Sequence, residues 1–348
     1  MDHDVRHHQL SHHADGARLL VEALRGYPSL GELQVIDGDA ANWISEPPFK
    51  PFLHRWEKIL GMQSQAAVIS SMNGEGDTSR KEALDALVSF FDPLLKSGIE
   101  SLATMRDKGS VSFADVWQLF PPGELIVTRQ LDVDIVCRVV ECREDKELAE
   151  DGVTEVEGAD PNSKSWRVEY QFADWYGEGA GGYVSVAKTI DKFSGSKKVR
   201  GLVVYPLSFS KDPEGMRSMT ARGRRFEELR GFHYLEGSGV KVLIGDSARR
   251  PFSGRVVLDA YDYYRSEGLE IPQATPFEGQ DADATASTDE DDNDSDGIPE
   301  IDVTENDKSV SRNENLVPMT DEQFLLASPW QIGMDLKTKE WGMFQTFP

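Results

Sequence analysis

The chain has 348 residues, of which 39% are hydrophobic and 28% charged, and its formal net charge is −24. This length leaves room for one large domain or two smaller ones, and the acidic balance argues against nucleic acid as the main partner. Cys137 and Cys142 are the only cysteines, so a disulfide scaffold and a four-thiolate zinc site are excluded. They lie five residues apart on one predicted strand and cannot readily bridge. Two cysteines fit a reducing compartment, no secretory h-region opens the chain, and no apolar run reaches the roughly 18 residues of a membrane span. We therefore expect an intracellular protein, cytoplasmic or nuclear.

The first part of the chain is expected to be helical after a flexible start. Residues 1–46 open with a histidine-rich run that reads as a disordered tail, although its spacing of four would suit a transition metal in a helix. Residues 47–110 contain a proline-rich turn and then a long apolar stripe that includes Leu84 and Phe91. We expect Pro93 to kink or divide the helix that carries this stripe.

From residue 111 to residue 270 the two-residue period of strands predicts an α+β domain, either a mostly antiparallel sheet or a partly open barrel. Leu202–Phe209 is almost wholly apolar, which indicates a strand buried on both faces. A central Arg-rich helix follows, with Asp212 as its N-cap and Phe226 on its apolar stripe. Gly231 is expected to end this helix in a left-handed conformation before the next strand.

The last part of the chain is expected to hold a linker and a short structured end. Residues 271–315 read as an acidic disordered linker, because 278–307 contain 13 acidic residues and no basic one. Residues 316–348 predict a short helix with a capping box at Thr320, then a hairpin that turns near Thr338.

Three sequence motifs bear on cofactor or metal chemistry. No Gly-x-x-x-x-Gly-Lys-Ser/Thr phosphate loop occurs, so we expect neither ATP binding nor a cofactor. The glycines of Gly177–Gly182 match the Gly-x-Gly-x-x-Gly pattern of a dinucleotide-binding motif, but they lie between two predicted strands and indicate a turn. Asp292–Gly297 matches the first half of a calcium loop, but Val303 stands where the bidentate glutamate belongs, so we predict no metal site.

A basic island on the central helix is the candidate partner-binding site. It consists of Arg217, Arg222, Arg224, Arg225, Arg230 and His233. Such a cluster can receive a phosphate or an acidic protein partner. The structural alternative is that these arginines form salt bridges with Glu214, Glu227, Glu228 and the sheet. A general base at His233 is conceivable, but no serine, cysteine or carboxylate partner is identifiable, so we assign no catalytic residue.

Several short motifs follow one another in a defined order along the chain. They are Pro51-Phe52-x-His54-Arg55-Trp56, Trp117-x-Leu119-Phe120-Pro121-Pro122-Gly123, Tyr205-Pro206-Leu207, Asp212-Pro213-Glu214, Arg222-Gly223-Arg224-Arg225-Phe226, Leu229-Arg230-Gly231-Phe232-His233-Tyr234 and Gly254-Arg255-Val256-Val257-Leu258-Asp259. Together they resemble the N-terminal domain, of unknown function, that precedes the AAA+ ATPase module in a group of filamentous-fungal proteins. Residues 316–344 are similar to the segment that joins that domain to the ATPase. The phosphate loop and the acidic metal-binding motif of the ATPase do not occur here, so the resemblance transfers no catalytic residue.

Three functions remain open from the sequence. The first is a non-catalytic interaction domain, in which a groove beside the Arg217–Arg230 helix recruits a protein partner or AAA+ ATPase subunits. The second is an acidic chaperone-like binder of basic proteins that acts through 281–307. The third is an enzyme centred on His233. The oligomeric state and the partner are left open.

Overall fold

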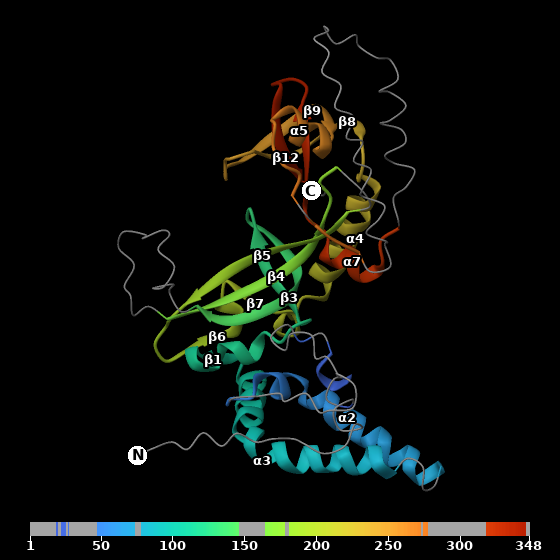
Figure 1. The fold of residues 1–348 in the computed structure, drawn as a ribbon. Coiled ribbons are helices and arrows are strands. Elements are labelled where there is room, and N and C mark those ends of the chain that lie inside the picture. Colours follow the sequence, from blue (N-terminus) through green and yellow to red (C-terminus); the bar gives the residue numbers. More distant parts are fainter. Residues whose placement is uncertain are drawn as a thin grey trace, which may run out of the picture. The chain divides into compact units, whose positions relative to one another are not determined.

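The computed structural model describes residues 19, 22–25, 27, 47–73, 78–145, 164–177, 181–272, 274–277 and 318–345 (Figure 1). The histidine-rich start, the calcium-like motif and the acidic run 278–307 lie outside these described residues. The chain divides into two compact units. One comprises Met1–Glu124, Val140–Val168 and Thr189–Leu202, and the other comprises Leu125–Val139, Glu169–Lys188 and Val203–Pro348.

Two long helices pack against each other in the first unit. They are α2 (Lys50–Asn73) and α3 (Thr78–Lys108), and the rings of Phe52 and Phe91 stack between them with centroids 3.8 Å apart. The helix α3 runs unbroken through Pro93, so the expected division does not occur. After α3 come the short strand β1 (Ser110–Ser112) and the 3-10 helix η3 (Phe113–Leu119), whose end is separated by one residue from Pro121 and Pro122.

The main sheet has six strands, and the pairs β10–β5, β2–β3 and β2–β7 are antiparallel. Its order is β10 (Thr275–Pro276), β5 (Gly182–Asp191), β4 (Ser165–Asp174), β3 (Val133–Asp145), β2 (Leu125–Gln130) and β7 (Val204–Pro206). Cys137 and Cys142 both lie on β3 with free thiols. The α+β class predicted from the sequence is therefore confirmed.

The prediction of a doubly buried strand over Leu202–Phe209 is wrong. Only three residues form a strand, β7, and Leu207–Phe209 is a 3-10 turn, η5. The strand β7 lies at the edge of the sheet, with β2 as its only neighbour there, and Val203 is 56% exposed. Pro206 is compatible with this edge position because it has no N–H to donate to a further strand.

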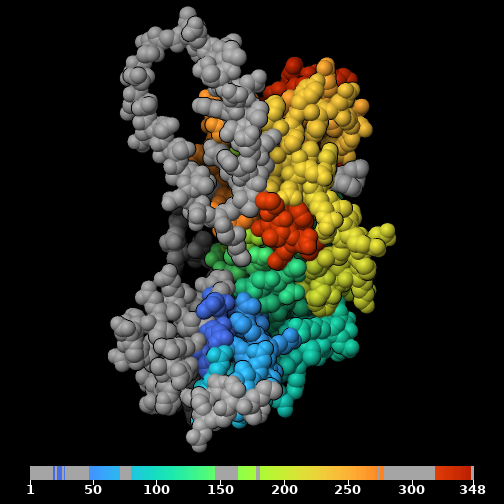
Figure 2. All heavy atoms as spheres, turned by 90° about the vertical axis from the view of Figure 1, so that its right-hand side faces the viewer, coloured from blue at the N-terminus to red at the C-terminus, as the bar shows by residue number. Residues whose placement is uncertain are grey.

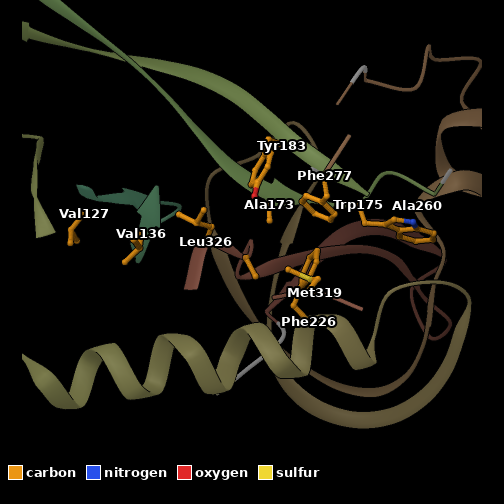
Figure 3. Packing of buried hydrophobic residues seen from close by; sticks show 11 residues of the cluster. Val127, Val136, Ala173, Trp175, Tyr183, Phe226, Ala260, Phe277, Met319 and Leu326 are labelled. Atoms are coloured by element: carbon orange, nitrogen blue, oxygen red, sulfur yellow. The ribbon is translucent and has the colours of Figure 1, made fainter. Parts of the chain in front are cut away.

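In the second unit, one helix lies against the core beneath the sheet. This helix is α4 (Pro213–Glu228), and its Phe226 is 1% exposed within the cluster drawn in Figure 3. Two residues that flank the acidic run belong to the same cluster, Phe277 on one side and Met319 on the other. The folded part therefore extends beyond residue 271, where the linker was expected to begin.

A small closed barrel completes the second unit. It has four strands, β8 (His233–Leu243), β9 (Arg249–Leu258), β11 (Trp330–Asp335) and β12 (Glu340–Gln345). The strand β8 pairs with β9 from His233 opposite Leu258 to Val242 opposite Arg249, with Gly237 opposite Gly254 in the middle. The C-terminal hairpin occurs as predicted, and it closes the barrel by pairing with β8 and β9.

None of the helices in the described ranges combines the length and the apolar character needed to cross a membrane.

Candidate partner-binding surfaces

The helix α4 is fixed at its start and along its inner face. The Asp212 side chain accepts a hydrogen bond from the backbone N–H of Gly215 at 2.9 Å, which confirms the predicted N-cap. The helix α7 (Asp321–Leu326) packs on α4, and Figure 2 shows the red atoms of α7 at the surface beside the yellow atoms of α4. Gly223 is at this contact, because a Cβ there would collide with the carbonyl of Phe324. The mid-helix glycine thus permits a close approach of the two helices.

Arg222, one of the predicted site residues, points into the protein. Its side chain is buried, and Nη1 donates to the carbonyl oxygen of Asp134 at 3.0 Å. Burial lowers the pKa of Arg222 to about 10, although the charge of Asp134 opposes this effect. Arg222 thus joins α4 to β3, which matches the structural alternative, and it is not available at the surface.

Arg230 and His233 form a second buried junction at the end of α4. Arg230 is 3% exposed and lies 3.4 Å from Glu227, and burial lowers its pKa. The Nε2 of His233 donates to the carbonyl oxygen of Arg230 at 2.9 Å. The Oε1 of Glu227 also accepts from the backbone N–H of Met319 at 2.6 Å, which fixes the start of α7. Arg230 and His233 therefore have a structural role at the end of α4.

The other three arginines of the predicted site point outward from α4. Arg224 is over half exposed, lies 3.9 Å from Asp321 and stacks over the ring of Phe324. Arg225 forms an ion pair with Glu228 at 2.8 Å. Arg217 is exposed and makes no ion pair with the residues that the structure describes. The helix thus presents positive charges that are partly neutralised by neighbouring acids, and partner binding at α4 stays a prediction.

A denser positive surface lies in the first unit, around the strand β6 (Ser196–Lys198). The strand pairs with β1 in a two-stranded sheet, with Ser110 opposite Lys198, and the backbone N–H of Val199 donates to the carbonyl of Gly109 at 2.9 Å. This pairing brings the end of α3 beside the residues that follow β6 (Figure 1). The β6 basic patch consists of the exposed residues Lys108, Lys192, Lys197, Lys198 and Arg200.

None of the five cations of the β6 basic patch forms an ion pair within the described ranges. The Nζ of Lys197 lies 4.7 Å above the ring centre of Phe193, a contact that leaves its charge available. Asp107 and Asp191 are exposed nearby but are not paired with the patch. Like charges on neighbouring residues repel one another, and this repulsion is smaller when a negatively charged group lies among them.

The β6 basic patch was missed from the sequence, although a signal was present. Residues 192–200 contain four basic residues and no acidic one in a strongly acidic chain. The sequence around α4 contains more arginines and was therefore predicted as the site. A helix buries one of its sides, however, and Arg222 and Arg230 are on the buried side. A short exposed strand between turns leaves every side chain accessible.

Comparison with known proteins finds a similarity over about a third of the chain. A family described as "Domain of unknown function (DUF7025)" matches residues 101–211. This stretch runs from the last turns of α3 through η5, so it includes all five residues of the β6 basic patch and ends before α4. No curated protein and no solved structure matches the chain. The chain thus contains an α+β region that resembles an uncharacterised domain.

Proposed function

We propose that this chain is a non-catalytic interaction module that binds an acidic segment of a partner protein through the β6 basic patch. One observation carries the proposal: five exposed cations are clustered without acidic partners in the described part of a chain whose net charge is −24. A single unpaired charge at the surface is not informative, because pairing it with an opposite charge would add little to stability. A cluster of one sign is different, because its repulsion is relieved when a complementary surface binds.

The partner that fits this patch is a protein rather than a nucleic acid. The chain as a whole repels polyanions, so a long phosphate backbone meets an unfavourable field beyond the patch. A short acidic segment engages the patch alone. The resemblance to the N-terminal region of fungal AAA+ ATPases suggests an ATPase subunit as one such partner. The alternative at α4 uses the same chemistry with fewer available charges.

Binding of a fluorescein-labelled peptide of 12 alternating glutamate and serine residues tests this proposal by fluorescence anisotropy. Reversing two charges with Lys197→Glu and Lys198→Glu should weaken binding about tenfold, which corresponds to about 1.4 kcal/mol. The matched control is Arg217→Glu with Arg224→Glu, which makes the same charge change on α4 and should have a smaller effect. Lys197 and Lys198 are exposed and form no ion pair among the described residues, so the β6 variant should melt like the parent chain, whereas Arg224→Glu also removes the contacts with Asp321 and Phe324 and should lower the melting temperature slightly.

Two outcomes contradict the proposal. If the α4 pair abolishes binding and the β6 pair does not, the interface lies at α4. If the two pairs weaken binding equally, the peptide responds only to total charge and the β6 basic patch is not a specific site.

A further inference from the structure

The strand β6 has an open edge next to the cations of the β6 basic patch. It pairs with β1 on one side, and the sheet contains no third strand among the described residues. All three of its residues are exposed. Gly195 precedes it with φ 69°, a left-handed turn that leads the chain into the strand. The edge therefore offers backbone N–H and C=O groups to a partner chain.

We infer that the acidic partner segment binds as an extended strand added to the open edge of β6, an inference that rests on the proposed function. Main-chain hydrogen bonds to Ser196–Lys198 would hold the segment, and its carboxylates would lie near the lysines of the patch. Because alternate residues of a strand point to opposite faces, Lys197 and Lys198 would meet carboxylates on both faces of the added strand. Arg200 and Lys108 lie beyond the same end of the β1–β6 pair, where Ser110 is opposite Lys198, so they would meet one end of the segment.

The lysines of this edge select the kind of strand that can be added. Lysine on an edge strand normally prevents edge-to-edge association, because two copies of the same edge repel each other. The same repulsion acts here against a second β6. It becomes attraction when the incoming strand carries carboxylates, since opposite charges across a strand pair stabilise it. The edge thus excludes its own copy and favours an acidic strand.

The two-stranded β1–β6 sheet gives a further reason for strand addition. A two-stranded ribbon is marginally stable, and a third strand would provide more pairing than the pair has alone. In the described structure, the β1–β6 pair is extended only by the Val199–Gly109 hydrogen bond. A bound strand should therefore add main-chain pairing to a ribbon that is itself held on the protein by the buried side chains of Val111 and Val199.

Two peptides of identical charge separate strand addition from simple attraction. Both have six residues in which two glutamates alternate with two threonines, so that carboxylates lie on both faces of the strand, but in the second every backbone amide is N-methylated and cannot donate to a strand edge. The full-length chain should bind the unmodified peptide at least about tenfold more tightly. Hydrogen exchange read by mass spectrometry should slow for the amides of residues 195–200 with the unmodified peptide, and not for an exposed turn such as 245–248.

The outcomes distinguish this inference from the proposed function. If both peptides bind equally and the exchange at β6 does not change, strand addition is wrong, while the acidic-partner function stands. If neither binds, or if Lys197→Glu with Lys198→Glu leaves binding unchanged, the proposed function itself is wrong. Tighter binding of a 12-nucleotide polyuridine would assign the patch to nucleic acid and overturn both.

Discussion

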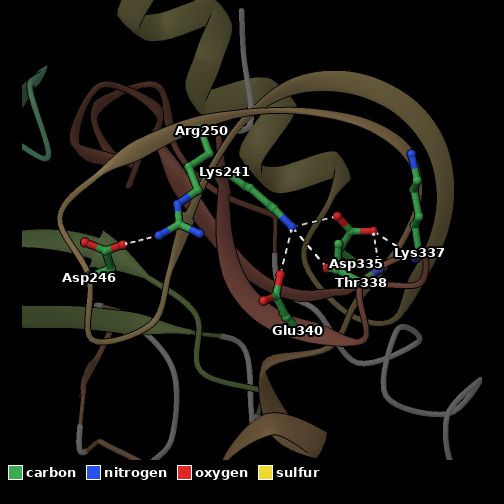
Figure 4. Close-up of polar contacts among 7 residues, drawn as sticks. All are labelled: Lys241, Asp246, Arg250, Asp335, Lys337, Thr338 and Glu340. Carbon is green, nitrogen blue, oxygen red and sulfur yellow. Dashed lines mark hydrogen bonds and ion pairs between the residues drawn. The ribbon is translucent and has the colours of Figure 1, made fainter.

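The ammonium group of Lys241 lies 2.7 Å from the Oδ2 atom of Asp335, and both side chains are less than a tenth exposed (Figure 4). This ion pair joins β8 to the turn between β11 and β12. Thr338 accepts a further hydrogen bond from Lys241 at 3.2 Å, and Glu340 lies 3.5 Å away. The Lys241 side chain lowers the pKa of Asp335, as do backbone N–H donors in the turn. The barrel is thus closed by a buried charge pair in addition to its strand pairing.

Removal of one member of this pair should destabilise the protein strongly. Lys241→Met leaves the Asp335 carboxylate buried without its cation, which typically costs about 3–5 kcal/mol. Adding Asp335→Asn removes the uncompensated charge and should restore at least about 1 kcal/mol. Urea midpoints measure both variants. The control is Arg250→Met, which breaks the half-exposed pair with Asp246 in Figure 4 and should cost under about 1 kcal/mol.

The pH dependence of the Lys241–Asp335 contribution has a definite sign. Because the folded pKa of Asp335 is below its ordinary value of 3.8, its contribution to stability is complete above pH 3.8 and is lost as the pH falls below 3.8.

If Lys241→Met and Arg250→Met lower the free energy of unfolding equally at neutral pH, the buried pair has no special role in closing the barrel.

Two glycines on helices should respond in opposite directions to alanine. Gly223→Ala places a Cβ against the Phe324 carbonyl, so α7 must shift and the free energy of unfolding should fall by about 1–3 kcal/mol. Gly61 on α2 has open space around its Cβ position, so Gly61→Ala should raise that free energy by about 0.5–1 kcal/mol. Chemical denaturation of both variants gives the two signs. A stabilising Gly223→Ala would mean that α4 and α7 are not in close contact.

Local signals in the sequence were sufficient for the elements around α4. The caps at Asp212 and Thr320 depend on residues three positions apart, and both are seen, as is the left-handed Gly231 at φ 99°. The burial of Arg222 was not predictable in this way, because its partner carbonyl at Asp134 is 88 residues away in the chain. Which arginines face inward depends on what covers the helix, and that is decided by long-range packing.

Barrel closure was beyond sequence reasoning for the same reason. The hairpin of residues 330–345 could be read from its alternation, but its pairing with β8 and β9 joins stretches about 75 residues or more apart. Periodicity identifies strands and gives no neighbours for them. The same limit applied to the β6 basic patch, in which Lys108 and Arg200 come together only through the β1–β6 pair.

His54 should make the first unit sensitive to mild acid. Its Nε2 donates to the Trp117 carbonyl at 3.2 Å, and its Nδ1 accepts from the Tyr27 hydroxyl at 2.9 Å, so the ring is neutral. Burial lowers the pKa of His54 from 6.5 to about 3. The unfolded chain therefore binds a proton that the folded chain does not, and stability should fall as the pH drops from about 6.5 towards 3.

The test of this prediction is the slope of stability against pH. One proton corresponds to about 1.4 kcal/mol per pH unit, so His54→Gln should flatten the profile between pH 6 and pH 4 by about that amount. The glutamine can preserve part of the hydrogen bonding. A variant with an unchanged slope would show that another group takes up the proton.

Asp174 should have the opposite effect on stability. It is the last residue of β4, accepts a hydrogen bond from the backbone N–H of Trp175 at 2.8 Å and contacts the side chains of Tyr176 and Ser328. Burial raises the pKa of Asp174 from 3.8 to about 7, against the lowering effect of these hydrogen bonds. The folded chain thus holds a proton that the unfolded chain releases. Its contribution is complete below about pH 3.8 and is lost as the pH rises through 7.

Asp174→Asn keeps the shape and the acceptor oxygen but cannot ionise. The difference in stability between the variant and the parent should therefore move in the variant's favour as the pH rises from 4 to 7, and it should level off above about pH 8. Urea midpoints at half-unit pH steps give this curve, and a matched Asp246→Asn series at an exposed turn should lack the rise. A flat difference curve would mean that Asp174 is already ionised in the folded chain at pH 4, and its hydrogen bonds would then outweigh its burial.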